Sequence, residues 1–345
     1  MKNNILLIIL FICSFTYSQQ IERVEPPFWW EGFKNTSLQL LVYGKNISNF
    51  DFNINSEIVE LVSVEKAQNP NYIFLNLEVN DKGKSGDFDI KYGDNSFKYN
   101  INKKELDSNN HLGFNTSDVL CLITPDRFIN GDYSNDNHAD MLEKASRGPW
   151  GRHGGDLIGI SDNLNYLVDL GYTAIWLNPI LENNMIKSSY HGYSTTDYYK
   201  VDPRFGSNSE FKELISKADK MGIKIIFDFI PNHSGSEHWF VKDPPFNNWI
   251  NFNNQYTQTN HRRETVQDIH ASEYDKKNFV DGWFVETMPD LNQNNKFMST
   301  YLIQNAIWWI EYSGIRGYRI DTYPYSDKKF MSDLTFTLMN EYPKF

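Results

Sequence analysis

The chain has 345 residues, of which 40% are hydrophobic, enough for two or three domains that each bury a core. Its formal net charge of −11 at pH 7 argues against nucleic acid or an anionic membrane surface as its main partner. A neutral polymer such as a glucan is not repelled by this charge. Aromatic residues reach 15%, which suits sugar binding through ring stacking but suits a large aromatic core equally well.

Residues 1–18 show the pattern of a secretory signal peptide, with Lys2 near the start, an apolar run over 5–15 and a small residue before Gln19. The run is too short for a membrane-spanning helix, which needs about 20 apolar residues, and no other stretch is long enough. We therefore expect cleavage before Gln19 and a secreted or periplasmic protein with no membrane span. Among the residues that remain, Cys121 has no second cysteine with which to form a disulfide.

Residues 19–110 predict an N-terminal all-β sandwich module. Short segments rich in β-forming residues alternate with clusters of Asn, Gly, Asp and Ser, and no helical pattern intervenes. The clearest strands are expected at 38–43, 58–62 and 72–77. The segment 104–116 is polar, and we interpret it as a linker to the next domain.

Apolar runs of strand length alternate with helical segments after residue 118, which predicts an α/β fold whose parallel sheet is covered by helices. Strands are expected at 119–123, 174–177, 224–229 and 317–320, and helices at about 161–170, 209–221 and 298–313. Asp162 and Ser209 are the expected N-caps of the first two helices, and Gly171 and Gly222 are expected to end them.

A long polar and aromatic stretch, 234–296, separates the third of these strands from its helix. It is far longer than the loops that ordinarily connect such elements. We interpret it as an inserted subdomain beside the active face.

Polar motifs follow the expected strands in a fixed order, at the ends where βα-barrel enzymes keep their active sites. They are the segments 171–179, 190–198, 228–233, 288–292 and 317–321. Together they resemble the alpha-amylase family of glycoside hydrolases over 119–345. Residues 21–105 are similar to the N-terminal module of its cyclomaltodextrinase and neopullulanase branch, and the run Glu-Pro-Pro-Phe-Trp-Trp at 25–30 is the best mark of it.

The resemblance implies a (β/α)8 TIM barrel, of which 111–345 would form the first half. It also implies hydrolysis of α-glucosidic bonds in starch-derived glucans by a retaining mechanism. The substrates of the family include maltooligosaccharides, cyclodextrins, pullulan and starch, and the preference between α-1,4 and α-1,6 bonds stays open.

Arg319 and Asp321 are two residues apart on an expected strand, so their side chains point to one face. A buried guanidinium favours the ionised form of a neighbouring carboxylate, and a retaining glycosidase needs an ionised Asp as its nucleophile. The resemblance assigns the nucleophile to Asp321 and makes Asp228 the residue that orients Arg319. The alternative is a purely structural ion pair at the strand end.

The resemblance also assigns substrate contacts to three residues of these motifs. His191 and His233 would hydrogen-bond the hydroxyls of the sugar being cleaved, and Tyr193 would stack on its ring. The alternative for each is a structural polar group whose hydrogen bonds are satisfied within the protein.

A second cluster of oxygen-bearing residues predicts a calcium site, because calcium takes six to eight oxygen ligands. It resembles the site of neopullulanase-type members, although its spacing does not match an EF-hand loop. The alternative is an Asn- and Asp-rich surface turn. The predicted ligands are Asn130, Asp132, Asn135, Asp136, Gly154 through its carbonyl, and Asp156.

The family's general acid is a Glu that ends the fifth barrel strand, and the sequence stops near where that strand should begin. We therefore expect the chain by itself to be an inactive N-terminal part of the enzyme. Two other readings stay open: a non-catalytic glucan-binding protein, and a family member that transglycosylates. A homodimer formed through the N-terminal module is a further expectation.

Overall fold

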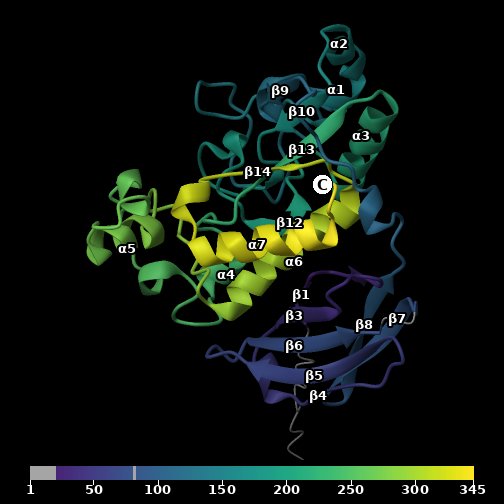
Figure 1. Ribbon diagram of the computed structural model, residues 1–345, viewed down its shortest axis with the longest axis vertical. Helices are drawn as coiled ribbons and strands as arrows, with labels where there is room; N and C mark the ends of the chain where they lie inside the picture. Colours follow the sequence, from purple (N-terminus) through teal and green to yellow (C-terminus); the bar gives the residue numbers. More distant parts are fainter. Residues whose placement is uncertain (1–20, 81–82) are drawn as a thin grey trace, which may run out of the picture.

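The computed structural model describes residues 21–80 and 83–345, so the expected signal segment lies outside the described residues. Figure 1 shows the N-terminal module, in purple and blue, beneath a larger α/β part whose last helix is yellow. In the described part of the chain, no helix has the length and apolar character needed to cross a membrane.

The N-terminal module is a β-sandwich, as predicted. Its described strands form two four-stranded sheets, ordered β1-β3-β6-β5 and β2-β8-β7-β4. Apolar side chains such as Leu40, Leu75 and Ile90 are completely buried between them. The first sheet contains β1 (Arg23–Glu25), β3 (Ser37–Tyr43), β6 (Tyr72–Val79) and β5 (Val59–Lys66), and the second contains β2 (Trp29–Trp30), β8 (Asn95–Asn102), β7 (Gly86–Tyr92) and β4 (Phe52–Ile54).

The α/β part is built on a parallel sheet ordered β14-β13-β10-β9 in the described residues, so neighbours in the chain are neighbours in space. This is the arrangement of consecutive strands in a barrel, and the predicted fold class is confirmed. The strands are β9 (Leu120–Ile123), β10 (Ala174–Leu177), β13 (Lys224–Phe229) and β14 (Tyr318–Ile320). The helices that pack beside them are α3 (Asn208–Lys220), α6 (Lys296–Ser313) and α7 (Lys328–Glu341), and a separate antiparallel pair is formed by β11 (Leu181–Glu182) and β12 (Asp197–Val201).

The first expected helix begins earlier than predicted and is divided into α1 (Leu157–Asp162) and α2 (Leu164–Asp169). The prediction of Asp162 as its N-cap is wrong. Asp156 caps α1 instead, because its Oδ1 accepts the backbone N–H of Gly159 at 2.7 Å.

The predicted N-cap of α3 is also wrong, by two residues. Ser207, not Ser209, caps this helix and forms a capping box with Glu210, in which each side chain accepts the other's backbone N–H. The predicted glycine ends are confirmed, since Gly171 and Gly222 have φ of 86° and 76°, the left-handed region that favours glycine.

The segment 104–116 is not a free linker. The Lys104 side chain is only 11% exposed, and its Nζ donates to Oε1 of Glu341 at 2.8 Å. Gly113 donates its backbone N–H to the carbonyl of Lys344 at 2.7 Å. Most of the segment is exposed to solvent, but these bonds to the end of α7 hold the two parts of the chain together here.

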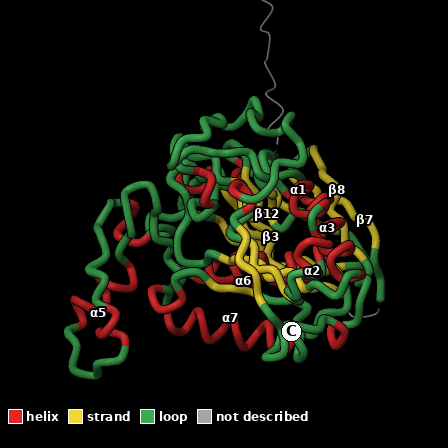
Figure 2. The backbone as a smooth tube through the Cα atoms, turned by 90° about the horizontal axis from the view of Figure 1, so that it is seen from above, coloured by secondary structure: helices red, strands yellow, loops and turns green. Residues whose placement is uncertain are grey.

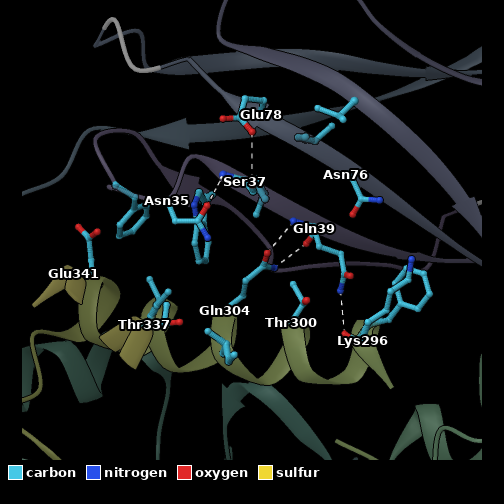
Figure 3. Close-up of a pocket in the computed structure, with 18 of the residues that line it drawn as sticks. Asn35, Ser37, Gln39, Asn76, Glu78, Lys296, Thr300, Gln304, Thr337 and Glu341 are labelled. Atoms are coloured by element: carbon cyan, nitrogen blue, oxygen red, sulfur yellow. Dashed lines mark hydrogen bonds between the residues drawn. The ribbon is translucent and has the colours of Figure 1, made fainter. Parts of the chain in front are cut away.

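The N-terminal module packs directly against α6 of the barrel part. Gln39 and Gln304 are both buried and exchange hydrogen bonds of 2.7 and 2.8 Å, shown as dashed lines in Figure 3. Beside them lies a groove of about 450 Å³. In Figure 3 one wall of this groove carries Asn35, Ser37 and Glu78 of the module, and the other carries residues of α6 and α7.

The insertion forms a lobe that projects from the barrel part, at the left of Figures 1 and 2. It contains α4 (Trp239–Lys242) and α5 (Glu273–Asp281). Its root is anchored to the N-terminal module, because Asp243 accepts hydrogen bonds from Tyr43 Oη at 3.1 Å and from Asn71 Nδ2 at 2.7 Å.

Candidate active site

Asp228, Arg319 and Asp321 meet at the carboxyl ends of two neighbouring strands. β13 and β14 pair in parallel with Asp228 beside Arg319, and Asp321 follows β14 directly. Arg319 Nη1 donates to Asp228 Oδ1 at 2.9 Å and to Asp321 Oδ1 at 2.6 Å. The guanidinium therefore lies between two carboxylates that are 2% and 7% exposed.

Burial and ion pairing act in opposite directions on Asp228. Burial raises its pKa to about 6, although Arg319 and the hydrogen bond from Trp176 oppose the rise. For Arg319, burial alone would lower the pKa, but the charge and hydrogen bonds of Asp228 together with the charge of Asp321 outweigh burial and raise the pKa. The arginine stays charged, while Asp228 changes its charge close to neutral pH.

Neutral donors also hold the Asp228 carboxylate. Trp176 Nε1 donates to its Oδ2 at 2.9 Å, and Tyr193 Oη donates to the same oxygen at 3.2 Å. Asn178 Nδ2 donates in turn to Tyr193 Oη at 2.7 Å. Sequence reasoning placed Trp176 and Asn178 in a motif but gave them no role. The available signal was their position at the end of β10, the strand next to β13.

The two predicted histidines lie together, and both are neutral. Burial lowers the pKa of His191 to about 4 and also lowers the pKa of His233. His191 Nδ1 accepts the backbone N–H of Tyr193 at 2.9 Å, which leaves its Nε2–H free to donate. His233 Nε2 donates to the carbonyl of Tyr193 at 3.1 Å, and its buried Nδ1 has no partner in the described residues. Each ring thus keeps one nitrogen that has no partner among the described residues.

The two histidines, Arg319 and Asp321 line one open cavity of about 440 Å³. Phe284 and Met288 of the insertion complete its apolar wall, and sequence reasoning gave neither of them a role. Thr322 also lines it, with a φ of 49° that is rare for a β-branched residue. The cavity is lined by His191, Tyr193, His233, Phe284, Met288, Arg319, Asp321 and Thr322.

The predicted calcium ligands also lie together, in loops before α1. Asn130 Nδ2 donates to Asp136 Oδ1 at 2.7 Å, and a Cβ on Gly154 would lie 2.3 Å from the same oxygen. The side-chain oxygens of Asn130 and Asn135 are buried and have no partner in the described residues. Unpaired buried oxygens are costly, and a cation would satisfy them.

Asp156 has a different position from the other predicted ligands. Its carboxylate accepts the backbone N–H groups of Gly131, Asp132 and Gly159 at distances between 2.7 and 3.1 Å. No group of three His, Cys, Asp or Glu side chains suited to a metal occurs in the described residues. A cation here would be held by the Asp136 carboxylate together with amide and carbonyl oxygens, and Asp156 would shape the loop around them.

Comparison with known proteins agrees with this geometry. Residues 122–338 match the family described as alpha amylase, catalytic domain, and residues 23–105 match the N-terminal domain of cyclomaltodextrinase. The chain is 32% identical to alpha-amylase 2 of Dictyoglomus thermophilum over 66% of its own length and 35% of the relative's. It is 36% identical to a cyclomaltodextrinase of Thermoanaerobacter pseudethanolicus over 60% of its length and 34% of the relative's.

Among solved structures, the alpha-amylase of Geobacillus thermoleovorans complexed with acarbose matches with a TM-score of 0.53 and 33% identity. The match covers 66% of this chain and 45% of that structure. The chain thus spans about a third of the curated relatives it matches, which share 35% and 34% of their length with it. The catalytic-domain match covers more than half of the chain, and the chain belongs to the alpha-amylase family.

Proposed function

We propose that this chain supplies the nucleophile of a retaining glycosidase that cleaves α-glucosidic bonds in starch-derived glucans. The observation that carries the proposal is Asp321 Oδ1 held by Arg319 at 2.6 Å, in a cavity with His191 and His233. Because Arg319 occupies Oδ1, Oδ2 is the oxygen available to attack the anomeric carbon and form a glycosyl-enzyme intermediate.

Asp228 is unsuited to act as the general acid of this reaction. The donors of Trp176, Tyr193 and Arg319 occupy its oxygens, so it orients the arginine instead. Asp321 is the only carboxyl that lines the cavity in the described part of the chain. We therefore assign the role of general acid to no carboxyl among the described residues.

The substrate class follows from the character of the cavity. Neutral histidines donate to and accept from hydroxyl groups without demanding a charged ligand, and the rings of Tyr193 and Phe284 offer apolar faces to a sugar. The relatives named above are an alpha-amylase and a cyclomaltodextrinase. We extend their substrate class, α-glucans, to this protein.

Proton NMR of the anomeric signals during hydrolysis of maltoheptaose by the full-length enzyme tests this proposal. The first product formed should keep the α configuration. An inverted product would show that Asp321 is not a nucleophile. Maltoheptaose binding without any turnover would favour the non-catalytic glucan-binding alternative.

The loop around Asn130 and Asn135 supports a second proposal, one bound calcium ion. Asn130, Asn135, Asp136 and the Gly154 carbonyl would hold it, with Asp132 at the rim. Its role would be structural, since it would tie the loop to the start of α1. Elemental analysis of protein dialysed against a small excess of calcium should find about one ion per chain.

Two further proposals concern the whole protein. Export is supported by the sequence of residues 1–18 alone, and N-terminal sequencing of the protein from its native host should return Gln19. Pairing of two chains through the N-terminal module stays a prediction, which sedimentation equilibrium checks directly.

A further inference from the structure

Trp176 contacts both members of the ion pair behind the proposed nucleophile. It lies in β10, in register with Ile226 of β13, and its Nε1 donates to Asp228 Oδ2 at 2.9 Å. The centre of its ring is 4.9 Å from Cζ of Arg319. The half-buried Trp176 side chain therefore makes two contacts. The N–H at the edge of its indole ring donates to the Asp228 carboxylate, and the face of the ring lies against the Arg319 guanidinium.

We propose that Trp176 is a positioning residue, whose indole N–H keeps Asp228 ionised and fixed so that Asp228 can hold Arg319 against Asp321. The inference rests on the proposed function for its catalytic consequence. The effect of the Trp176 hydrogen bond on the ionisation of Asp228 does not depend on the proposed function, and it can be measured without any enzymatic turnover.

The donor set around Asp228 explains why this one N–H matters. Arg319 Nη1 is shared between Asp228 and Asp321, so neither carboxylate has the guanidinium to itself. Tyr193 Oη is both donor and acceptor, because it also receives a hydrogen bond from Asn178. An indole N–H can only donate, so Trp176 is a donor that never reverses.

Arg319 stabilises the charge of Asp228 most, through its own charge and its hydrogen bonds, and the Trp176 hydrogen bond adds to this effect. The carboxyl is 2% exposed, and the ionisable groups that face it are Arg319 and Asp321 beside β14 and Tyr193 in the adjoining loop. Burial already raises the pKa of Asp228 to about 6. Loss of a donor to the charged form would raise the pKa further, and protonated Asp228 would release Arg319.

Packing alone does not account for this arrangement. Trp308 is 1% exposed, and its Nε1 has no hydrogen-bond partner in the described residues, so a phenyl ring could provide the same kind of contact there. Trp176 differs because its N–H reaches a charged group. Trp308→Phe is therefore a matched control for Trp176→Phe, since it removes an indole without removing a hydrogen bond.

The first experiment is a ¹³C NMR titration of the Asp228 carboxyl in this chain. A hydrogen bond to a charged group contributes enough that the Asp228 pKa should rise by about one unit or more in Trp176→Phe. Trp308→Phe should leave it unchanged. An unchanged Asp228 pKa in a folded Trp176→Phe variant would overturn the proposal.

A second measurement needs no variant and remains decisive if Trp176→Phe does not fold. The Nε1 proton resonance of Trp176 in the wild-type chain should shift with pH, with the same midpoint as Asp228. A resonance that does not respond to that titration would contradict the link between the two groups.

In the full-length enzyme, the acid limb of the kcat profile should move to higher pH in Trp176→Phe by the same amount as the Asp228 pKa. KM should change little, and turnover should recover toward the wild-type value above that limb. A uniform loss at every pH would show a merely structural role. Absence of turnover in the wild type would refute the proposed function, while the two NMR titrations would still decide the role of Trp176.

Discussion

The candidate active site and the candidate calcium loop are both polar clusters, but they differ in how their charges are satisfied. At the active site, Arg319 lies between two carboxylates, and Asp228 accepts from two further donors. Among the described residues, the only cation beside Asp136 in the loop is Arg147, at 3.9 Å, and the side-chain oxygens of Asn130 and Asn135 have no partner. Each carboxylate of the first cluster has a cationic partner at hydrogen-bonding distance, whereas the second cluster has unpaired oxygens that a cation would satisfy.

Replacement of the proposed nucleophile, Asp321, should give the largest effect on the active-site side of this comparison. Asp321→Asn keeps the size of the side chain but removes the attacking oxygen, so turnover by the full-length enzyme should fall by several orders of magnitude. The melting temperature should change little. Near-normal turnover of maltoheptaose in this variant would show that the nucleophile is a different residue.

Asp228→Asn should have a smaller effect on turnover than Asp321→Asn. The amide still fits beside Arg319, but it no longer holds the guanidinium by charge, and misplacement of this kind costs about 10²-fold. Measuring kcat of the two variants under the same conditions shows which of the two residues contributes more to turnover. A loss from Asp228→Asn that equals or exceeds the loss from Asp321→Asn would reverse the assignment.

Removal of calcium should affect stability rather than chemistry. An ion that binds only the folded chain stabilises it by about 2.7 kcal/mol when its free concentration is 100 times the dissociation constant. EDTA should therefore lower the melting temperature, and added calcium should restore it. Asp136→Ala should lose this response while Asp321→Asn keeps it. A melting temperature that does not respond to EDTA in the wild type would count against the site.

A third buried cluster, between module and barrel, should give the smallest effect. Glu25 accepts from Tyr301 Oη at 2.7 Å and from Arg23, and burial raises its pKa to about 7. Because the folded pKa lies above the ordinary value of 4.5, stability should fall as pH rises through this interval. In Glu25→Gln, thermal melts between pH 4.5 and 7 should show a weaker decline. An unchanged slope would mean that other groups carry the dependence.

The sequence predicts most of the strands well because β9, β10 and β13 are mostly apolar runs, and β13 matches the prediction at both ends. It also predicts Asp228, Arg319 and Asp321 as a group, since βα repeats bring strand ends to one edge. The positioning role of Trp176 is beyond this reasoning, because it depends on the register between β10 and β13. The early start of α1 is missed because Asp156, read as a metal ligand, serves as its N-cap.

The polar segment 104–116 shows that amino-acid composition does not predict which polar residues make contacts with distant parts of the chain. A lysine among Asn, Asp and Ser is typical of solvated chain, yet Lys104 lies over the ring of Phe33 at 4.0 Å and pairs with Glu341. Its partner is more than 200 positions away in the chain, so local patterns contain no sign of it.

The anchoring of Asp243 by Tyr43 and Asn71 has a consequence for protein engineering. The N-terminal module is hydrogen-bonded to the root of the same insertion whose Phe284 and Met288 line the cavity beside Asp321. A chimera that takes either part alone from a relative would lose the matching surface at this joint. Module and insertion should therefore be exchanged together, as one cassette, when the substrate range of such an enzyme is redesigned.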